Sequence, residues 1–241
     1  MSRAFFLLPV LLLSACVSDG PQSGNTKPDF KEASRLNAEL GADYLGKGQI
    51  EQAKEKLERA VDQDSDNAQA HASLALVYVR LGETSDARRQ FRKALSLSGD
   101  DPSLKNNYGT FLCGQGDIEE AEVLFLEAAR DRRYTTPEAA LTNAGVCLRR
   151  SNDPARVEEY FREALQINPE FPDALSQMAQ WSYDKADYLR ARAFMQRFER
   201  VGKHSADTLK LAAQTERKLG DRAEAIRYER RRKKAFPDAQ P

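Results

Sequence analysis

Small and apolar residues recur at regular intervals along most of this 241-residue chain. One set of small side chains returns every 34 residues, apart from one interval of 36: Ala53, Ala87, Ala121, Val157, Ala191 and Ala225. A second set of mostly large apolar residues follows the first by four positions: Leu57, Phe91, Phe125, Phe161 and Met195. Residues four positions apart share one face of a helix. The pattern therefore predicts a series of amphipathic helices.

Six units of equal length fit this pattern. They span 34–67, 68–101, 102–135, 138–171, 172–205 and 206–239, with Thr136 and Pro137 as an insertion. The eighth place of every unit is small, as expected where two helices cross: Gly41, Ala75, Gly109, Gly145, Ala179 and Ala213. Four units have a glycine where a helix would end with positive φ: Gly48, Gly82, Gly116 and Gly220. The units resemble the tetratricopeptide repeat. The resemblance predicts an all-α fold, a right-handed α-solenoid of six tetratricopeptide repeats.

The sixth unit departs from the apolar pattern. Three of its usually apolar or small places hold Glu216, Glu229 and Arg232. Terminal repeats of a solenoid need a polar outer face, so we expect these three side chains to face water as a cap.

The first 15 residues are typical of a signal peptide, with Arg3, a short apolar run and then small residues. The run is too short to cross a bilayer. Leu13-Ser14-Ala15-Cys16 resembles the lipobox of bacterial lipoproteins, in which the cysteine is lipidated and becomes the first mature residue. The alternative is an ordinary signal peptide with a cysteine near its cleavage site.

Lipidation of Cys16 with chains such as palmitate would anchor the protein to a membrane. Val17 follows the cysteine in place of an aspartate, and by resemblance to the lipoprotein sorting rule this favours the periplasmic face of the outer membrane. Residues 16–33 then form the lipidated cysteine and a polar, flexible tether.

The first helix of each repeat lines the concave face of this fold. In the first two units its concave positions are mostly apolar, whereas in the last unit they include Asp207, Lys210 and Gln214. An apolar strip of small residues admits a helix or an extended peptide. The candidate partner-binding groove consists of Ala38, Ala42, Leu45, Ala72, Leu76 and Val79. The alternative is that the tether or a neighbouring helix covers these side chains.

Cys113 and Cys147 lie late in the first helices of the third and fourth units. These helices are neighbours in the stack, and a secreted chain meets an oxidising compartment. We therefore expect a disulfide that joins the two units across the Thr136-Pro137 insertion. The alternative is two free thiols that pack as small apolar side chains.

Charge and composition narrow the function. The 37 basic residues cancel the 37 acidic ones, so no net positive charge favours nucleic acid. The two histidines, His71 and His204, belong to no Ser-His-Asp pattern or metal-ligand cluster, and no glycine-rich phosphate loop is present. We expect no catalytic residue, metal, cofactor or small-molecule substrate.

The block Asn106-Asn107-Tyr108-Gly109-Thr110-Phe111-Leu112-Cys113, together with the lipobox and the repeats, is similar to the type IV pilus biogenesis lipoprotein family PilF/PilW. Tyr134, Pro137, Asn143, Gly145 and Cys147 add to the resemblance. Members of that family are pilotins, which help the pilus secretin reach the outer membrane and form its multimeric pore. The resemblance implies a secretin subunit bound in the groove of the first repeats and a role in pilus assembly and twitching motility.

A second function class stays open. The same architecture would suit a general envelope scaffold that adapts peptidoglycan synthases or outer-membrane assembly machinery.

Overall fold

Twelve helices and no strand make up the part of the chain described by the computed structural model, residues 29–149 and 153–239. The helices are α1 (Phe30–Gly46), α2 (Ile50–Gln63), α3 (Ala68–Leu81), α4 (Thr84–Leu97), α5 (Pro102–Gln115), α6 (Ile118–Arg130), α7 (Pro137–Leu148), α8 (Pro154–Ile167), α9 (Pro172–Asp184), α10 (Tyr188–Val201), α11 (Ala206–Lys218) and α12 (Arg222–Ala235).

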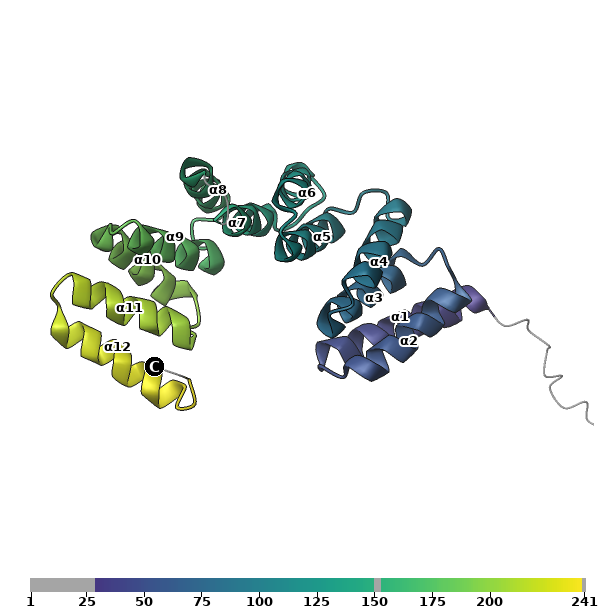
Figure 1. Ribbon diagram of the computed structural model, residues 1–241, viewed down its shortest axis with the longest axis horizontal. Helices are drawn as coiled ribbons and strands as arrows, with labels where there is room; N and C mark the ends of the chain where they lie inside the picture. Colours follow the sequence, from purple (N-terminus) through teal and green to yellow (C-terminus); the bar gives the residue numbers. More distant parts are fainter. Residues whose placement is uncertain (1–28, 150–152, 240–241) are drawn as a thin grey trace, which may run out of the picture.

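Each odd-numbered helix pairs with the helix that follows it, and the six pairs stack side by side into an arch (Figure 1). In the middle of the arch, α5 and α7 lie on the inner side and α6 and α8 on the outer side. The predicted all-α solenoid of six repeats is confirmed.

Small residues at the eighth place allow the two helices of a pair to approach closely. A Cβ atom added to Gly145 would lie 2.5 Å from Cε1 of Phe161, and one added to Gly41 would lie 2.5 Å from Cγ of Leu57. Leu57 and Phe161 are fully buried. The predicted helix crossing is therefore the place where the large apolar side chains of the second helix fill the repeat.

The predicted turn residues have the expected backbone conformation. Gly48, Gly82, Gly116 and Gly220 all have positive φ, between 73° and 92°. Ala186 occupies the same place between α9 and α10 with φ of 60°, although a side chain disfavours this left-handed conformation. Among the described turns of this series, the one at Ala186 is therefore strained.

Helix α1 begins at Phe30 rather than at residue 34. The side chain of Asp29 accepts hydrogen bonds from the backbone N–H groups of Lys31 and Glu32 and so caps the helix. Residues 30–33, which the sequence assigned to the tether, are therefore helical. The signal peptide, Cys16 and residues 17–28 of the tether lie outside the described residues.

The polar residues of the sixth repeat do not all face water. Glu216 is only 5% exposed, and its carboxylate accepts a hydrogen bond from Nε of Arg192 on α10 at 2.9 Å. The expectation that Glu216 faces water is wrong. Its side chain lies between α11 and α10, and a carboxylate is tolerated in such a buried position only when it is paired with an opposite charge. Glu229 and Arg232 are half-buried, and Glu229 forms an ion pair with Arg217.

A second polar cluster joins α10, the connection between α10 and α11, and α12. The carboxylate of Glu199 accepts hydrogen bonds from Tyr228 at 3.1 Å and Arg231 at 2.7 Å, and Nε2 of His204 lies 3.2 Å from it. Burial opposes ionisation of Glu199, but these hydrogen bonds outweigh it and lower the carboxyl pKa below its ordinary value. Burial also lowers the pKa of His204, against the effect of its bond to Glu199.

Candidate partner-binding groove

The predicted groove residues come from the first two odd-numbered helices: Ala38, Ala42 and Leu45 from α1, and Ala72, Leu76 and Val79 from α3. Ala42, Leu45, Ala72 and Leu76 are half-buried, and Val79 is exposed. Ala38 is only 2% exposed. The first pair of repeats therefore presents apolar surface from five of the six side chains, while Ala38 belongs to the core.

Two of the predicted residues line a hollow between the second and third repeats. Ala72 and Leu76 of α3 face a cavity of about 120 Å³ that also contacts Leu104 and Asn107 of α5. The connection between these repeats contains two consecutive residues with positive φ, Gly99 and Asp100. Part of the predicted groove on α3 thus continues onto α5.

Sequence reasoning missed Leu104 and Asn107. The expected concave positions were places 2, 5, 9, 12 and 13 of each unit, whereas these residues occupy the third and sixth places of their unit. Asn107 nevertheless belongs to the Asn-Asn-Tyr-Gly block that carries the family resemblance, and this was the available signal.

A second apolar surface lies at the N-terminal end of the solenoid. Leu36 and Leu40 of α1 are 51% and 39% exposed. The equivalent places in the second repeat hold Ala70 and Leu74, which are buried. The second to fifth repeats bury both places, and the sixth buries Ala212 but leaves Thr208 half-buried, whereas no described repeat precedes α1. The end face formed by Leu36 and Leu40 is thus open to a partner.

Charged side chains border this apolar surface. Arg35 of α1 lies between Glu32 and Glu39, with Nη2 2.6 Å from Glu32 and Nη1 2.5 Å from Glu39. Hydrogen bonds to the two carboxylates raise the pKa of Arg35 above its ordinary value. These ion pairs are exposed and add little stability. They form a polar rim beside the end face of Leu36 and Leu40.

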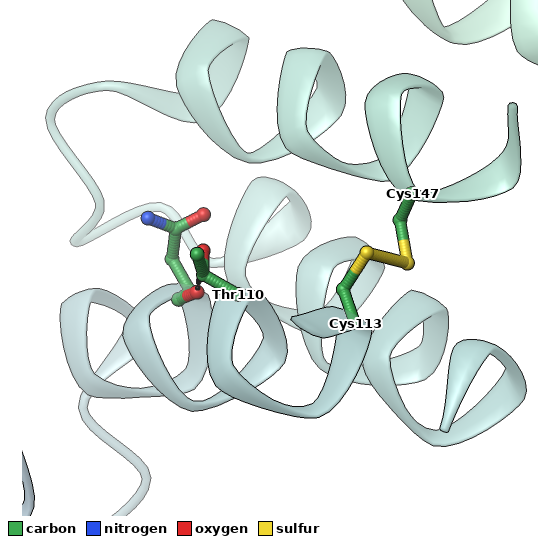
Figure 2. Close-up of a disulfide and its surroundings, with 4 residues drawn as sticks. Thr110, Cys113 and Cys147 are labelled. Atoms are coloured by element: carbon green, nitrogen blue, oxygen red, sulfur yellow. Dashed lines mark hydrogen bonds between the residues drawn. A yellow bond between two sulfur atoms is a disulfide. The ribbon is translucent and has the colours of Figure 1, made fainter. Parts of the chain in front are cut away.

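Cys113 and Cys147 meet where α5 and α7 end (Figure 2). Their Cα atoms are 5.6 Å apart, within the range for a disulfide, and their sulfur atoms are joined. Cys147 is fully buried. The bond links the third repeat to the fourth and closes a loop that contains the whole of α6.

The buried His71 makes hydrogen-bond contacts with neighbouring residues of the fold. Nδ1 of the buried His71 lies 2.6 Å from Oε1 of Gln90, and Nε2 lies 3.0 Å from the carbonyl oxygen of Ser65. No group of three or more possible ligands is arranged for a metal among residues 29–149 and 153–239. None of the helices described is long and apolar enough to span a membrane.

The class of protein follows from the repeat itself. A sequence model of the tetratricopeptide repeat matches residues 39–102 and 112–173, which contain most of the first four helix pairs. This is a tetratricopeptide-repeat protein.

The whole-length relatives are more specific. The type IV pilus assembly protein PilF of Pseudomonas aeruginosa is 34% identical over 233 residues, covering 96% of this chain and 92% of PilF. This chain belongs to the PilF/PilW family of type IV pilus biogenesis proteins.

Solved structures agree with this assignment. A structure of Pseudomonas aeruginosa PilF aligns with a TM-score of 0.75 at 33% identity, covering 87% of this chain and 95% of that one. PilW, described as a widely conserved type IV pilus biogenesis factor, aligns with a TM-score of 0.76 at 29% identity, covering 86% and 95%. The fold and the family together indicate a protein of type IV pilus biogenesis that acts through protein partners.

Proposed function

We propose that this protein is a pilotin: an outer-membrane lipoprotein that binds the type IV pilus secretin subunit and promotes its outer-membrane localisation and multimerisation. Membership of the PilF/PilW family carries the proposal. The open apolar surface of the first two repeats supports it, because burial of apolar side chains there stabilises a complex by about 25 cal/mol per Å². The proposed binding surface comprises Ala42, Leu45, Ala72, Leu76 and Val79 of the predicted groove and, at the end face, Leu36 and Leu40.

Secretin assembly distinguishes this role from that of a general envelope scaffold. Deletion of the protein should abolish the heat-resistant secretin multimers seen on a gel and should reduce the amount of secretin in the outer-membrane fraction. Unchanged multimers and unchanged fractionation would refute the pilotin role and leave the scaffold.

Point variants test the surface. Val79→Asp and Leu76→Asp should abolish multimers, because a carboxylate on this surface cannot be buried against an apolar partner. Leu189→Asp is the matched control, since Leu189 is 68% exposed on α10, far along the chain from the first repeats. Circular dichroism shows whether each variant is folded. Because Val79 is exposed, Val79→Asp still tests the surface if Leu76→Asp does not fold. Normal assembly in both variants would place the secretin site elsewhere.

We infer that Cys16 carries the lipid anchor. Cys16→Ser should release the protein from the outer-membrane fraction and remove the added mass of the acyl chains. A Cys16→Ser protein that still fractionates with the outer membrane would favour an ordinary signal peptide.

The periplasmic location adds a reason for the pairing of Cys113 and Cys147, because thiols there are oxidised. Mass spectrometry after alkylation under non-reducing conditions should find neither cysteine labelled. Two alkylated thiols would show that the pair is free in the cell.

A further inference from the structure

Basic side chains gather on one face of α12, the last helix described. Its exposed residues on that face are four cations and one apolar side chain: Arg222, Ile226, Arg230, Lys233 and Lys234. With 3.6 residues per turn, these five positions fall within about 120° of the helix circumference. The buried residues of the helix, Ala225 and Tyr228, lie on the opposite side. We call the five exposed side chains the basic face.

The four cations of the basic face have no partner in the described part of the chain. None of their side chains forms an ion pair or a hydrogen bond with a residue in 29–149 or 153–239. The two carboxylates of α12 are already occupied, since Glu224 forms an ion pair with Arg227 and Glu229 forms one with Arg217. The positive charge of the face is therefore not cancelled within the helix.

Carboxylates on the neighbouring segments leave this excess in place. Glu199 of α10 accepts hydrogen bonds from Tyr228 and Arg231, and Asp221 caps the first turn of α12. Asp238, beyond the end of the helix, is exposed and has no partner among the described residues. Four unpaired cations thus stand against one unpaired carboxylate.

The repeat pattern shows what this face replaces. The twenty-eighth place of the first four units holds an apolar residue that is half-buried against the core: Val61, Leu95, Ala129 and Leu165. The sixth unit has the exposed Lys233 at this place. The last described repeat has therefore exchanged an apolar packing position for a cation.

Solubility alone does not explain a single sign of charge. A terminal repeat needs a polar outer face, and side chains of either sign meet that need. Arg230 and Lys234 are four positions apart on α12, and like charges at this spacing destabilise a helix. An anionic partner removes that repulsion and gains from all four cations.

The arrangement of the face suits a membrane surface. Ile226 is 48% exposed between the cations. Helices that lie on membranes combine apolar side chains, which enter the headgroup region, with basic side chains, which meet lipid phosphates. Arg222 and Lys234 are about 18 Å apart along the helix axis, so the face spans several headgroups. A phospholipid layer offers both an array of phosphates and an apolar interior for Ile226.

The shape of the solenoid brings this face to the side of the molecule where the chain begins. In Figure 1, α1 and α12 lie at the two lower ends of the arch, whereas α6 and α8 lie at its top. Helix α12 is the lowest helix of its end, below α11. A membrane that holds the N-terminal end can therefore also meet α12.

We propose that the basic face of α12 binds the anionic phospholipid headgroups of the membrane that carries this protein. Arg222, Arg230, Lys233 and Lys234 pair with lipid phosphates, and Ile226 enters the headgroup region. The identity of that membrane rests on the proposed anchor at Cys16, whereas the lipid contact itself does not require the pilotin role. The arch then touches the membrane at both ends.

Vesicle binding by the purified full chain tests the contact without secretin. Cys16→Ser removes the acyl chains, and vesicles of phosphatidylcholine alone measure what the apolar N-terminal segment contributes. Vesicles with about 30% phosphatidylglycerol should bind at least about tenfold more tightly. Arg230→Gln combined with Lys233→Gln should weaken this binding about thirtyfold, because each cation close to an anionic membrane strengthens binding about fivefold.

A matched control removes the same charge elsewhere. Arg92 and Arg132 are exposed cations of the second and third repeats, and neither forms an ion pair with a described residue. Arg92→Gln combined with Arg132→Gln should weaken binding less than about threefold, because charges beyond the Debye length are screened. Circular dichroism shows whether both double variants are folded.

A fluorescent side chain reports whether the face enters the headgroup region. The chain has one tryptophan, Trp181, which is only 8% exposed on α9. Ile226→Trp adds a second at the centre of the basic face. Phospholipids with brominated acyl chains should quench the added tryptophan in bound protein, whereas the fluorescence of the protein with Trp181 alone should not change.

Four results would overturn the proposal. Vesicles with and without phosphatidylglycerol bind equally, the basic-face variant loses no more affinity than its control, or the tryptophan at position 226 stays unquenched in bound protein. The fourth is that soluble polyglutamate binds as tightly as the anionic vesicles, which would indicate an acidic protein partner. None of these results bears on secretin assembly, so failure here leaves the pilotin role to its own tests.

Discussion

Reduction of the Cys113–Cys147 disulfide should destabilise the middle of the solenoid. The two cysteines are 34 residues apart, and the chain-entropy relation for a loop of that length gives about 3.8 kcal/mol at 25 °C. The loop contains all of α6 together with the connection to α7. Because each repeat contacts only its neighbours, we expect the loss to concentrate at the junction of the third and fourth repeats.

Urea unfolding of the oxidised and the reduced protein, followed by circular dichroism, measures the effect. With an m value of about 3 kcal/mol/M, the expected loss corresponds to about 1.3 M in the unfolding midpoint. A solenoid can unfold in more than one step, so hydrogen exchange at the amides of α6 and α7 supplies a local measure. Those amides should exchange faster in the reduced protein, while amides of α2 and α12 should change little.

A variant without thiols separates the covalent bond from packing. Cys113→Ala with Cys147→Ala removes two side chains, of which Cys147 is fully buried, whereas the reduced wild type keeps both. The reduced protein and the double variant should both be less stable than the oxidised protein. Unfolding midpoints of the oxidised and the reduced protein that agree within about 0.3 M urea, equivalent to about 1 kcal/mol, would refute the loop-closure reasoning.

Three further perturbations test other parts of the fold. Arg192→Ala should lower the free energy of unfolding by about 1–3 kcal/mol because it leaves the buried Glu216 without its donor. Adding Glu216→Leu to this variant should restore the midpoint of thermal unfolding. An Arg192→Ala protein as stable as the wild type would contradict this reasoning. Ala186→Gly should stabilise the protein by up to about 1 kcal/mol by relieving its positive φ, with a lower midpoint in urea contradicting it. His204 and Glu199 both have lowered pKa values, so the folded protein binds fewer protons than the unfolded chain and stability should fall as pH drops, first below 6.5 for His204 and then below 4.5 for Glu199. Urea midpoints from pH 8 to 4 should fall on acidification, and Glu199→Gln should reduce the fall below pH 4.5 without abolishing it, because Glu158 also has a lowered pKa; a midpoint that rises on acidification would contradict both assignments.

The repeat architecture could be predicted from the sequence because its determinants are local. Gly145 and Phe161 belong to one repeat, and their contact requires only the helix crossing that the 34-residue period implies. The glycines of the turns also act within a few residues, through the φ values of a helix end. Because such features recur from unit to unit, the repeated pattern supports the prediction of a helical repeat.

The surfaces that bind partners could be predicted only in part. The apolar character of Leu76 and Val79 was visible in the sequence, but the burial of Ala38 depends on how α1 packs against its neighbours. The end face of Leu36 and Leu40 exists because no described repeat covers α1. A repeat pattern treats every unit alike, so it does not distinguish the unit that no described repeat covers.

The sequence by itself determined the repeat, its register and the family, since a period and a block of residues are read along the chain. Only the tertiary structure decided that Glu216 is buried beside Arg192, that Leu104 joins Leu76 around one hollow, and that α1 and α12 lie on the same side of the arch (Figure 1). Each of these depends on the angle at which one repeat meets the next. That angle results from side chains distant in sequence packing together, and no local pattern encodes it.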